Sequence, residues 1–89
     1  MEQSLHEKIL WSGKRQLAGV RVVVEISSWD SFKQVSFIFD RSEVSEMSDQ
    51  QLSNLITNNV NGFSNKEFSI NRVDNKIFVN TSIDELFED

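Results

Sequence analysis

The sequence predicts an α+β fold: a single small domain whose four strands form one antiparallel sheet, with helices packed mainly on one face. Two segments alternate between apolar and polar residues with the period of two that strands require. The segment between them carries apolar residues at helical spacing. A length of 89 residues fits one domain. The predicted order of elements is α-β-β-α-β-β, followed by an acidic tail.

The first element is a short helix predicted over residues 5–12. Ser4 and Glu7 match the S-x-x-E capping box, in which each side chain accepts a hydrogen bond from a backbone amide at the start of a helix. Gly13 follows as a typical helix stop. Two turns of helix are not stable alone, so we expect this helix to pack on the rest of the domain.

Residues 17–40 carry the strongest structural signal, which predicts a hairpin with strands near 17–27 and 33–40. In each strand the alternate apolar residues form one face, and we expect this face to build the core. Its members are Val20, Val22, Val24, Ile26, Val35, Phe37 and Phe39. Val23 and Ile38 then lie on the opposite face of the sheet.

A helix is predicted over residues 49–60, laid across the sheet. Ser48 and Gln51 form a second capping box, and Asn61-Gly62 is a typical helix end. The apolar residues at helical spacing between them are Leu52, Leu55, Ile56 and Val60.

A second hairpin is predicted over residues 67–81, with Asp74-Asn75 as its two-residue turn. This turn would place the apolar residues of both strands on one face, namely Phe68, Ile70, Ile77 and Val79. Phe78 then lies on the other face. Residues 82–89 mix acidic and apolar side chains and form the predicted acidic tail.

The composition favours a protein partner over other partners. The net charge is −5 and the basic residues are scattered, whereas a nucleic-acid groove or an anionic membrane requires clustered Lys and Arg. The absence of cysteine excludes disulfides and thiolate metal sites. There is neither a signal peptide nor an apolar run of about 20 residues that would span a membrane. We therefore expect a cytoplasmic protein.

The sequence offers little for catalysis, and we expect neither an enzyme nor a bound cofactor or metal. His6 is the only histidine, no cysteine nucleophile exists, and no glycine-rich phosphate loop is present. Carboxylates recur at every third position, at Asp40, Glu43, Glu46 and Asp49. Without the spacing of a calcium loop, we interpret them as a solvated, helix-capping set or as an acidic patch that faces a partner.

Large apolar residues outside the expected core indicate a binding surface. Trp29 lies in the polar connection of the first hairpin, where aromatic side chains are favoured binding anchors, although it could also fold back on the sheet. Val23, Ile38 and Phe78 would expose an apolar patch if helices cover only one sheet face. A second covered face or a homodimer are the alternatives.

The leading functional hypothesis is a non-enzymatic protein-binding module, such as a small acidic inhibitor, an immunity-type protein or an adaptor. The residues expected to contact the partner are Trp29, Val23, Ile38, Phe78, Asp40, Glu43 and Glu46. Three alternatives stay open: a nucleic-acid mimic that binds a basic partner, a nucleic-acid binder that stacks bases on its sheet, and a structural subunit of an oligomer.

Overall fold

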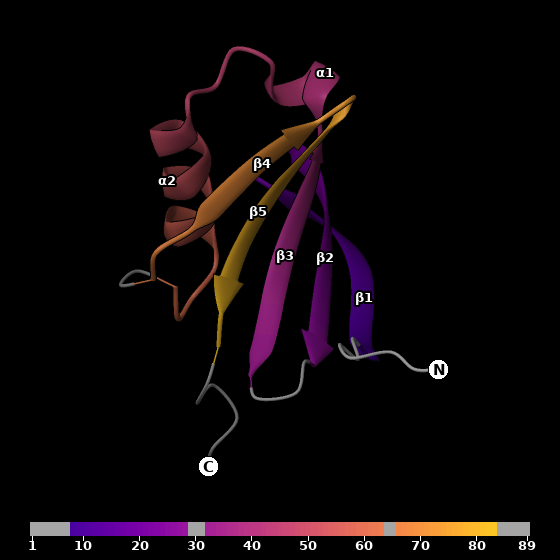
Figure 1. Ribbon diagram of the computed structural model, residues 1–89. Helices are drawn as coiled ribbons and strands as arrows, with labels where there is room; N and C mark the ends of the chain where they lie inside the picture. The colour runs from indigo at the N-terminus through magenta and orange to yellow at the C-terminus, as the bar shows by residue number, and fades with distance from the viewer. Residues whose placement is uncertain (1–7, 29–31, 64–65, 84–89) are drawn as a thin grey trace.

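A computed structural model of the chain describes residues 8–28, 32–63 and 66–83. Within these residues, five strands form one antiparallel sheet in the order β1-β2-β3-β5-β4, and two helices lie between β3 and β4 in the chain (Figure 1). The elements are β1 (Lys8–Leu17), β2 (Val20–Ser28), β3 (Lys33–Asp40), α1 (Arg41–Val44), α2 (Asp49–Asn59), β4 (Ser69–Val73) and β5 (Lys76–Ser82). The fold is a small compact α+β domain in which the antiparallel sheet dominates.

The sheet has five strands rather than the predicted four, because the N-terminal segment forms β1 and not a helix. Of the predicted helix, residues 8–12 belong to β1, and residues 5–7 lie outside the described residues. β1 pairs with β2 from Lys8↔Ser28 to Leu17↔Val20. A two-turn helix is costly to nucleate and its capping box is only a local signal, whereas pairing with a valine-rich strand satisfies the backbone of the whole segment.

Two local features explain why the sequence pattern does not indicate β1 as a separate strand. The pairing register shifts between Ile9 and Trp11, so a bulge interrupts the alternation at Leu10. The turn to β2 consists of Ala18 and Gly19, both with positive φ (51° and 86°), which suits a tight two-residue hairpin. The strand predicted over 17–27 is therefore divided, with its first residue in β1.

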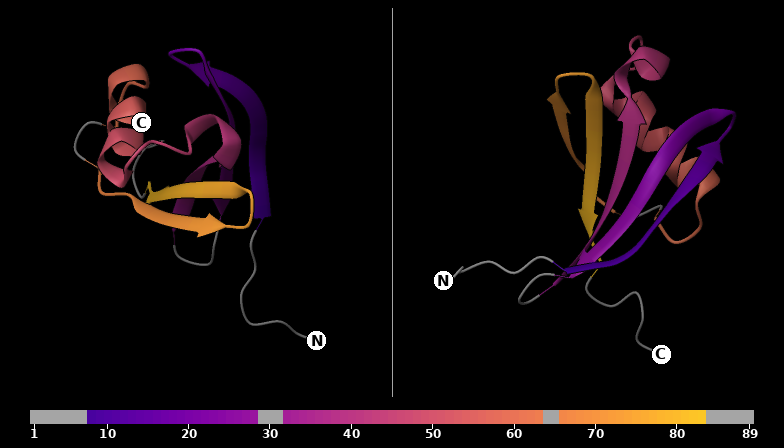
Figure 2. Two further views of the ribbon diagram at one scale, coloured as in Figure 1. Left: turned by 90° about the horizontal axis from the view of Figure 1, so that it is seen from above. Right: turned by 90° about the vertical axis from the view of Figure 1, so that its right-hand side faces the viewer.

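The strands of the central hairpin pair so that their apolar residues meet on one face. β2 and β3 align Val22 with Phe39, Val24 with Phe37 and Ile26 with Val35. The second hairpin turns at Asp74 and Asn75 and joins the sheet through β5, which pairs with β3. The sheet curves strongly, with hairpins β1–β2 and β4–β5 at its two ends and α2 on its inner side (Figure 2).

Helix α2 begins with a complete capping box. The Ser48 hydroxyl accepts a hydrogen bond from the Gln51 amide at 3.2 Å, and the Gln51 side chain accepts one from the Ser48 amide at 2.8 Å. Leu52 and Ile56 are fully buried against the sheet. The helix therefore has a fixed start and covers part of the inner face of the sheet.

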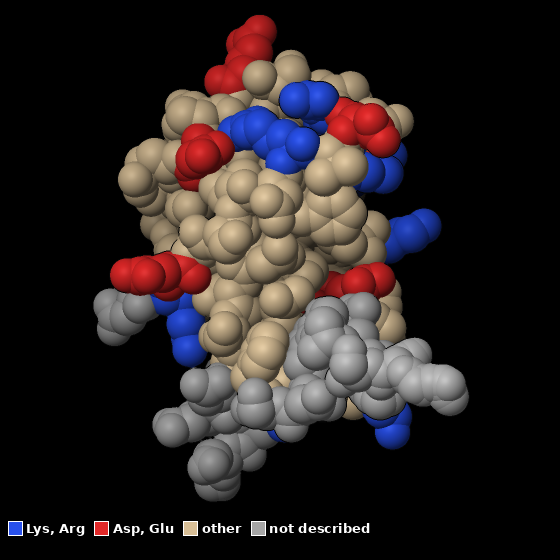
Figure 3. All heavy atoms as spheres, in the orientation of Figure 1, with Lys and Arg blue, Asp and Glu red and all other residues tan. Residues whose placement is uncertain are grey.

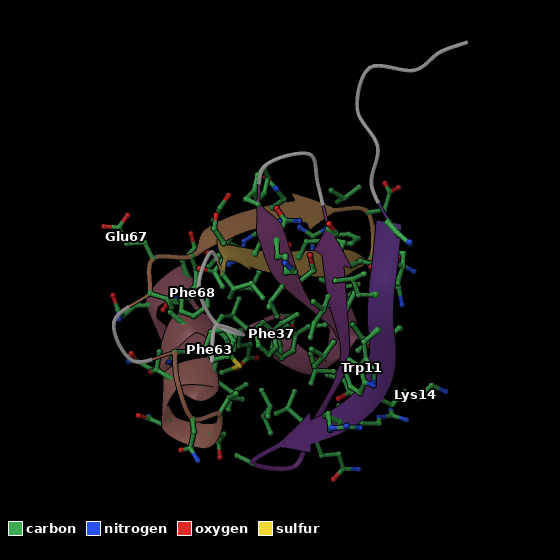
Figure 4. The ribbon with its side chains drawn as sticks, turned by 90° about the horizontal axis from the view of Figure 1, so that it is seen from below. Trp11, Lys14, Phe37, Phe63, Glu67 and Phe68 are labelled. Carbon is green, nitrogen blue, oxygen red and sulfur yellow. The ribbon has the colours of Figure 1, made fainter. Side chains whose placement is uncertain are left out.

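The core lies between the inner sheet face and the two helices. Phe37 of β3 and Phe63 after α2 make an edge-to-face contact with ring centroids 5.6 Å apart, and Phe68 stacks on Phe63 (Figure 4). The buried apolar residues are Leu17, Val22, Val35, Phe37, Phe39, Val44, Leu52, Ile56, Phe63, Ile77, Val79 and Ile83. The predicted tail thus begins inside the fold, because Ser82 ends β5 and Ile83 is buried. Residues 84–89 lie outside the described residues.

Candidate functional site

The described residues contain no group of three or more His, Cys, Asp or Glu side chains that could hold a metal ion. His6 lies outside them. No helix in the described part of the chain is long and apolar enough to cross a membrane. Two surfaces, one on each face of the sheet, are the candidate sites considered below.

On the outer face, opposite α2, three apolar residues are direct neighbours across three strands. Val23 of β2 pairs with Ile38 of β3, and Ile38 pairs with Phe78 of β5. Lys14 on β1 and Asn71 on β4 continue this row to both edges of the sheet. All three apolar side chains are half-buried, so each still exposes part of its surface. We refer to Val23, Ile38 and Phe78 as the outer row.

A groove of about 730 Å³ lies at the end of this face where the outer row meets β1. Val23 and Ile38 line it together with four cations, Lys14, Arg15, Arg21 and Lys76. Asp40 is the one carboxylate among its described lining residues. Lys and Arg side chains gather at the upper end of the face in Figure 3, next to carboxylates and above a broad area without charged side chains. The groove therefore combines an apolar surface with a basic border.

The predicted acidic patch is divided into ion pairs. Asp40 contacts Lys76 at 3.0 Å, and Glu43 accepts a hydrogen bond from Nε of Arg21 at 2.8 Å. Asp49, at the start of α2, pairs with Arg72 of β4. Glu46 is exposed between α1 and α2. Because cations pair with Asp40, Glu43 and Asp49, these three carboxylates do not form a continuous negative surface.

The charge of the chain is unevenly distributed. All nine Lys and Arg lie in the described residues, whereas only seven of the fourteen Asp and Glu do, so this part carries a formal charge of +2 although the whole chain carries −5. The net negative charge thus resides outside the described residues.

On the inner face, β1 carries a group of residues that the sequence prediction missed. Trp11, Gly13 and Arg15 are alternate residues of one strand face. The Trp11 ring lies over Gly13, where an added Cβ would come within 2.7 Å of the ring, and the Arg15 guanidinium lies 4.8 Å from the ring centroid. In Figure 4 Trp11 points toward the interior and Lys14 points away from it. The signal for this group is the alternation W-x-G-x-R, which becomes visible only if the segment is taken as a strand.

These inner-face residues border a hollow of about 470 Å³ between hairpin β1–β2 and the segment that follows α2. We refer to it as the inner hollow. Its described lining is mostly apolar and includes Val24, Ile26 and Phe37 of the sheet and Phe63 after the helix. Trp29, the predicted loop anchor, lies outside the described residues and is not placed in either surface.

Comparisons of the chain with protein-family models, with curated proteins and with solved structures give no match.

Proposed function

We propose that the protein is a non-enzymatic protein-binding module, acting in the cytoplasm as an inhibitor, immunity-type protein or adaptor. The outer row carries this proposal: Val23, Ile38 and Phe78 are adjacent and partly exposed on the sheet face opposite α2. A contiguous apolar patch with a polar border is typical of a surface that binds another protein.

The groove next to the outer row indicates what kind of segment the partner presents. Lys14, Arg21 and Lys76 line it, and Asp40 is the only acidic residue among its described lining residues. Glu43, outside this lining, forms an ion pair with Arg21. An apolar side chain flanked by carboxylates would cover Val23 and Ile38 and meet these cations. We therefore propose a partner segment that is apolar and acidic. This proposal differs from the sequence-based hypothesis, in which Asp40, Glu43 and Glu46 also contact the partner.

The ion pairs of Asp40 and Glu43 weigh against the nucleic-acid mimic, because a mimic must present unpaired negative charge to its partner. The two proposals predict opposite charge effects. Lys14→Glu should weaken binding of an acidic partner by about tenfold and reduce its sensitivity to salt. The same change should strengthen the binding of a basic partner.

Quantitative affinity capture from the native host tests the proposal. The wild-type chain, Ile38→Thr and the control Lys33→Gln would be used as baits, and the captured proteins compared by mass spectrometry. Ile38→Thr keeps a β-branched residue in the strand but removes the centre of the outer row. We expect a protein captured by the wild type and the control to be lost with Ile38→Thr, while thermal unfolding shows that this variant is folded. Equal capture by all three baits would contradict the proposal.

A further inference from the structure

The inner hollow is separate from the outer row, and its size suits a small molecule. Its volume of about 470 Å³ lies within the range of about 300–1,000 Å³ in which ligand pockets fall. Beside Trp11 and Leu17 of β1, its apolar wall contains Val24, Ile26, Val35, Phe37, Val60 and Phe63. These residues come from β2, β3 and the segment that follows α2.

One position on the inner face of β1, Gly13, offers no side chain to cover the sheet beside the hollow. In the register of β1 and β2, Val24 lies opposite Gly13, which has no side chain, and Val22 lies opposite Arg15. Val22 is buried in the core, whereas Val24 and Ile26 are only half-buried. Apolar surface on the core face of a strand is therefore left partly uncovered at this point.

The rim of the hollow is held in place by the Trp11 group. The Trp11 ring lies against the Gly13 backbone, and Arg15 packs over the ring while its Nη1 donates a hydrogen bond to the carbonyl oxygen of Lys14 at 2.8 Å. Arg15 has no ion pair within the described part of the chain. It is also the only charged side chain among the described residues that line the hollow. The guanidinium can therefore bind an anion at the rim.

We propose that the inner hollow binds a small amphipathic carboxylate, whose hydrocarbon chain packs on the apolar wall and whose carboxylate pairs with Arg15. Two features select this ligand class. The apolar lining favours a hydrocarbon body, and a single unpaired cation at the rim favours one negative group. The polar neighbours Gln16, Asn59 and Asn61 at the same hollow add amide groups that can bind the carboxylate or its water.

Trp11 fluorescence tests the proposal directly. In a Trp29→Phe background Trp11 is the only tryptophan. It would be titrated with octanoate and octyltrimethylammonium below their micelle concentrations, and with octanol below its solubility limit. We expect octanoate to change the emission saturably, octanol to bind more weakly and the cation to bind weakest. Arg15→Gln should lower octanoate affinity about fivefold, as expected for a partly exposed ion pair, and leave octanol unchanged. Equal affinities for the three probes, or no effect of Arg15→Gln, would overturn the proposal.

Lys14→Gln is the matched control for Arg15→Gln. Lys14 is the preceding residue of the same edge strand, but its register partner is Val23 of the outer row. Octanoate affinity should therefore be unchanged in this variant. Arg15 also borders the outer groove. A loss of octanoate binding with Lys14→Gln would assign the ligand to that groove and overturn the proposal.

Two further measurements keep the proposal testable if Arg15→Gln alters the fold. Val24→Phe places a larger side chain opposite Gly13 and should abolish the binding of octanoate and octanol alike. In ¹⁵N-labelled wild-type protein, octanoate should shift the amides of Val24, Ile26 and Phe63. Shifts confined to the outer row would place octanoate on the other face and contradict the proposal. Trp11 emission that changes with protein concentration, and not with octanoate, would show that a second copy of the chain covers the hollow, which also contradicts it.

Discussion

The two flanks of the sheet differ in how completely their inner faces are covered. On the β5 flank, Ile77 and Val79 are fully buried and belong to the same core as Leu52 and Ile56 of α2. On the β2 flank, Val24 and Ile26 face the same side of the sheet but remain half-buried. Both β2 and β5 pair with β3 in regular antiparallel registers. The hydrogen bonds of a sheet therefore do not decide which flank is closed; the side chains that cover it do.

Because of this difference, we expect the closed flank to determine stability and the open flank to be available for binding. Burial of apolar side chains supplies most of the folding free energy, so the closed flank should contribute most to stability. The open flank retains apolar surface that the fold does not use, and it holds the inner hollow. On the outer face, the outer row crosses both flanks, because Val23 lies on β2 and Phe78 on β5.

The largest expected effect comes from one substitution made on each flank. Ile77→Ala should lower the free energy of unfolding by about 3 kcal/mol, because it leaves a cavity in closed packing. Ile26→Ala removes the same atoms from the half-covered flank and should cost about 1 kcal/mol. Urea unfolding of the two variants measures both values. Equal losses of unfolding free energy in the two variants would contradict the claim that one flank is closed and the other open.

A smaller effect is expected for Gly13→Ala at the rim of the open flank. The new Cβ would meet the Trp11 ring at 2.7 Å, so the half-exposed ring must move. We expect a loss of at most about 1 kcal/mol in unfolding free energy, together with a red shift of Trp11 emission in the Trp29→Phe background. Ser12→Ala, on the opposite face of the strand, is the control.

A double-mutant cycle sharpens this prediction. If the clash with the ring is the cause, Gly13→Ala should no longer destabilise a chain that also carries Trp11→Ala. An unchanged cost in that background would show that the backbone of β1, and not Trp11, requires glycine.

Much of the fold follows from local patterns, while its N-terminal strand does not. The alternation of apolar residues indicates the strand faces of β2 and β3, and the Ser48–Gln51 pair indicates the start of α2. β1 was wrongly predicted as a helix because the bulge at Leu10 interrupts its alternation and a capping-box pattern precedes it. Pairing with β2 decides whether this segment is a helix or a strand. That pairing is a contact between segments, so the local sequence pattern does not reveal it.

The same limit applies to the candidate sites. Alternation places Val23 and Ile38 on the face opposite the core, but their adjacency to Phe78 depends on the strand order β2-β3-β5. The pairing of Asp40 with Lys76 joins residues 36 positions apart in the sequence. The Trp11 group is not recognisable from a sequence pattern that predicts a helix for its segment. Predicting a site that spans several strands therefore requires the order and pairing register of the strands, and not only the residue pattern within each strand.

The most direct test of the proposed function maps where the captured partner binds. Amide chemical shifts of the ¹⁵N-labelled protein would be followed as the partner is added. If the outer row is the binding surface, the amides of Val23, Ile38 and Phe78 should show the largest shifts, and those of Lys14 and Lys76 at its border should also shift. Shifts centred on Val24, Ile26 and Phe63 of the inner hollow, with the outer row unaffected, would contradict it.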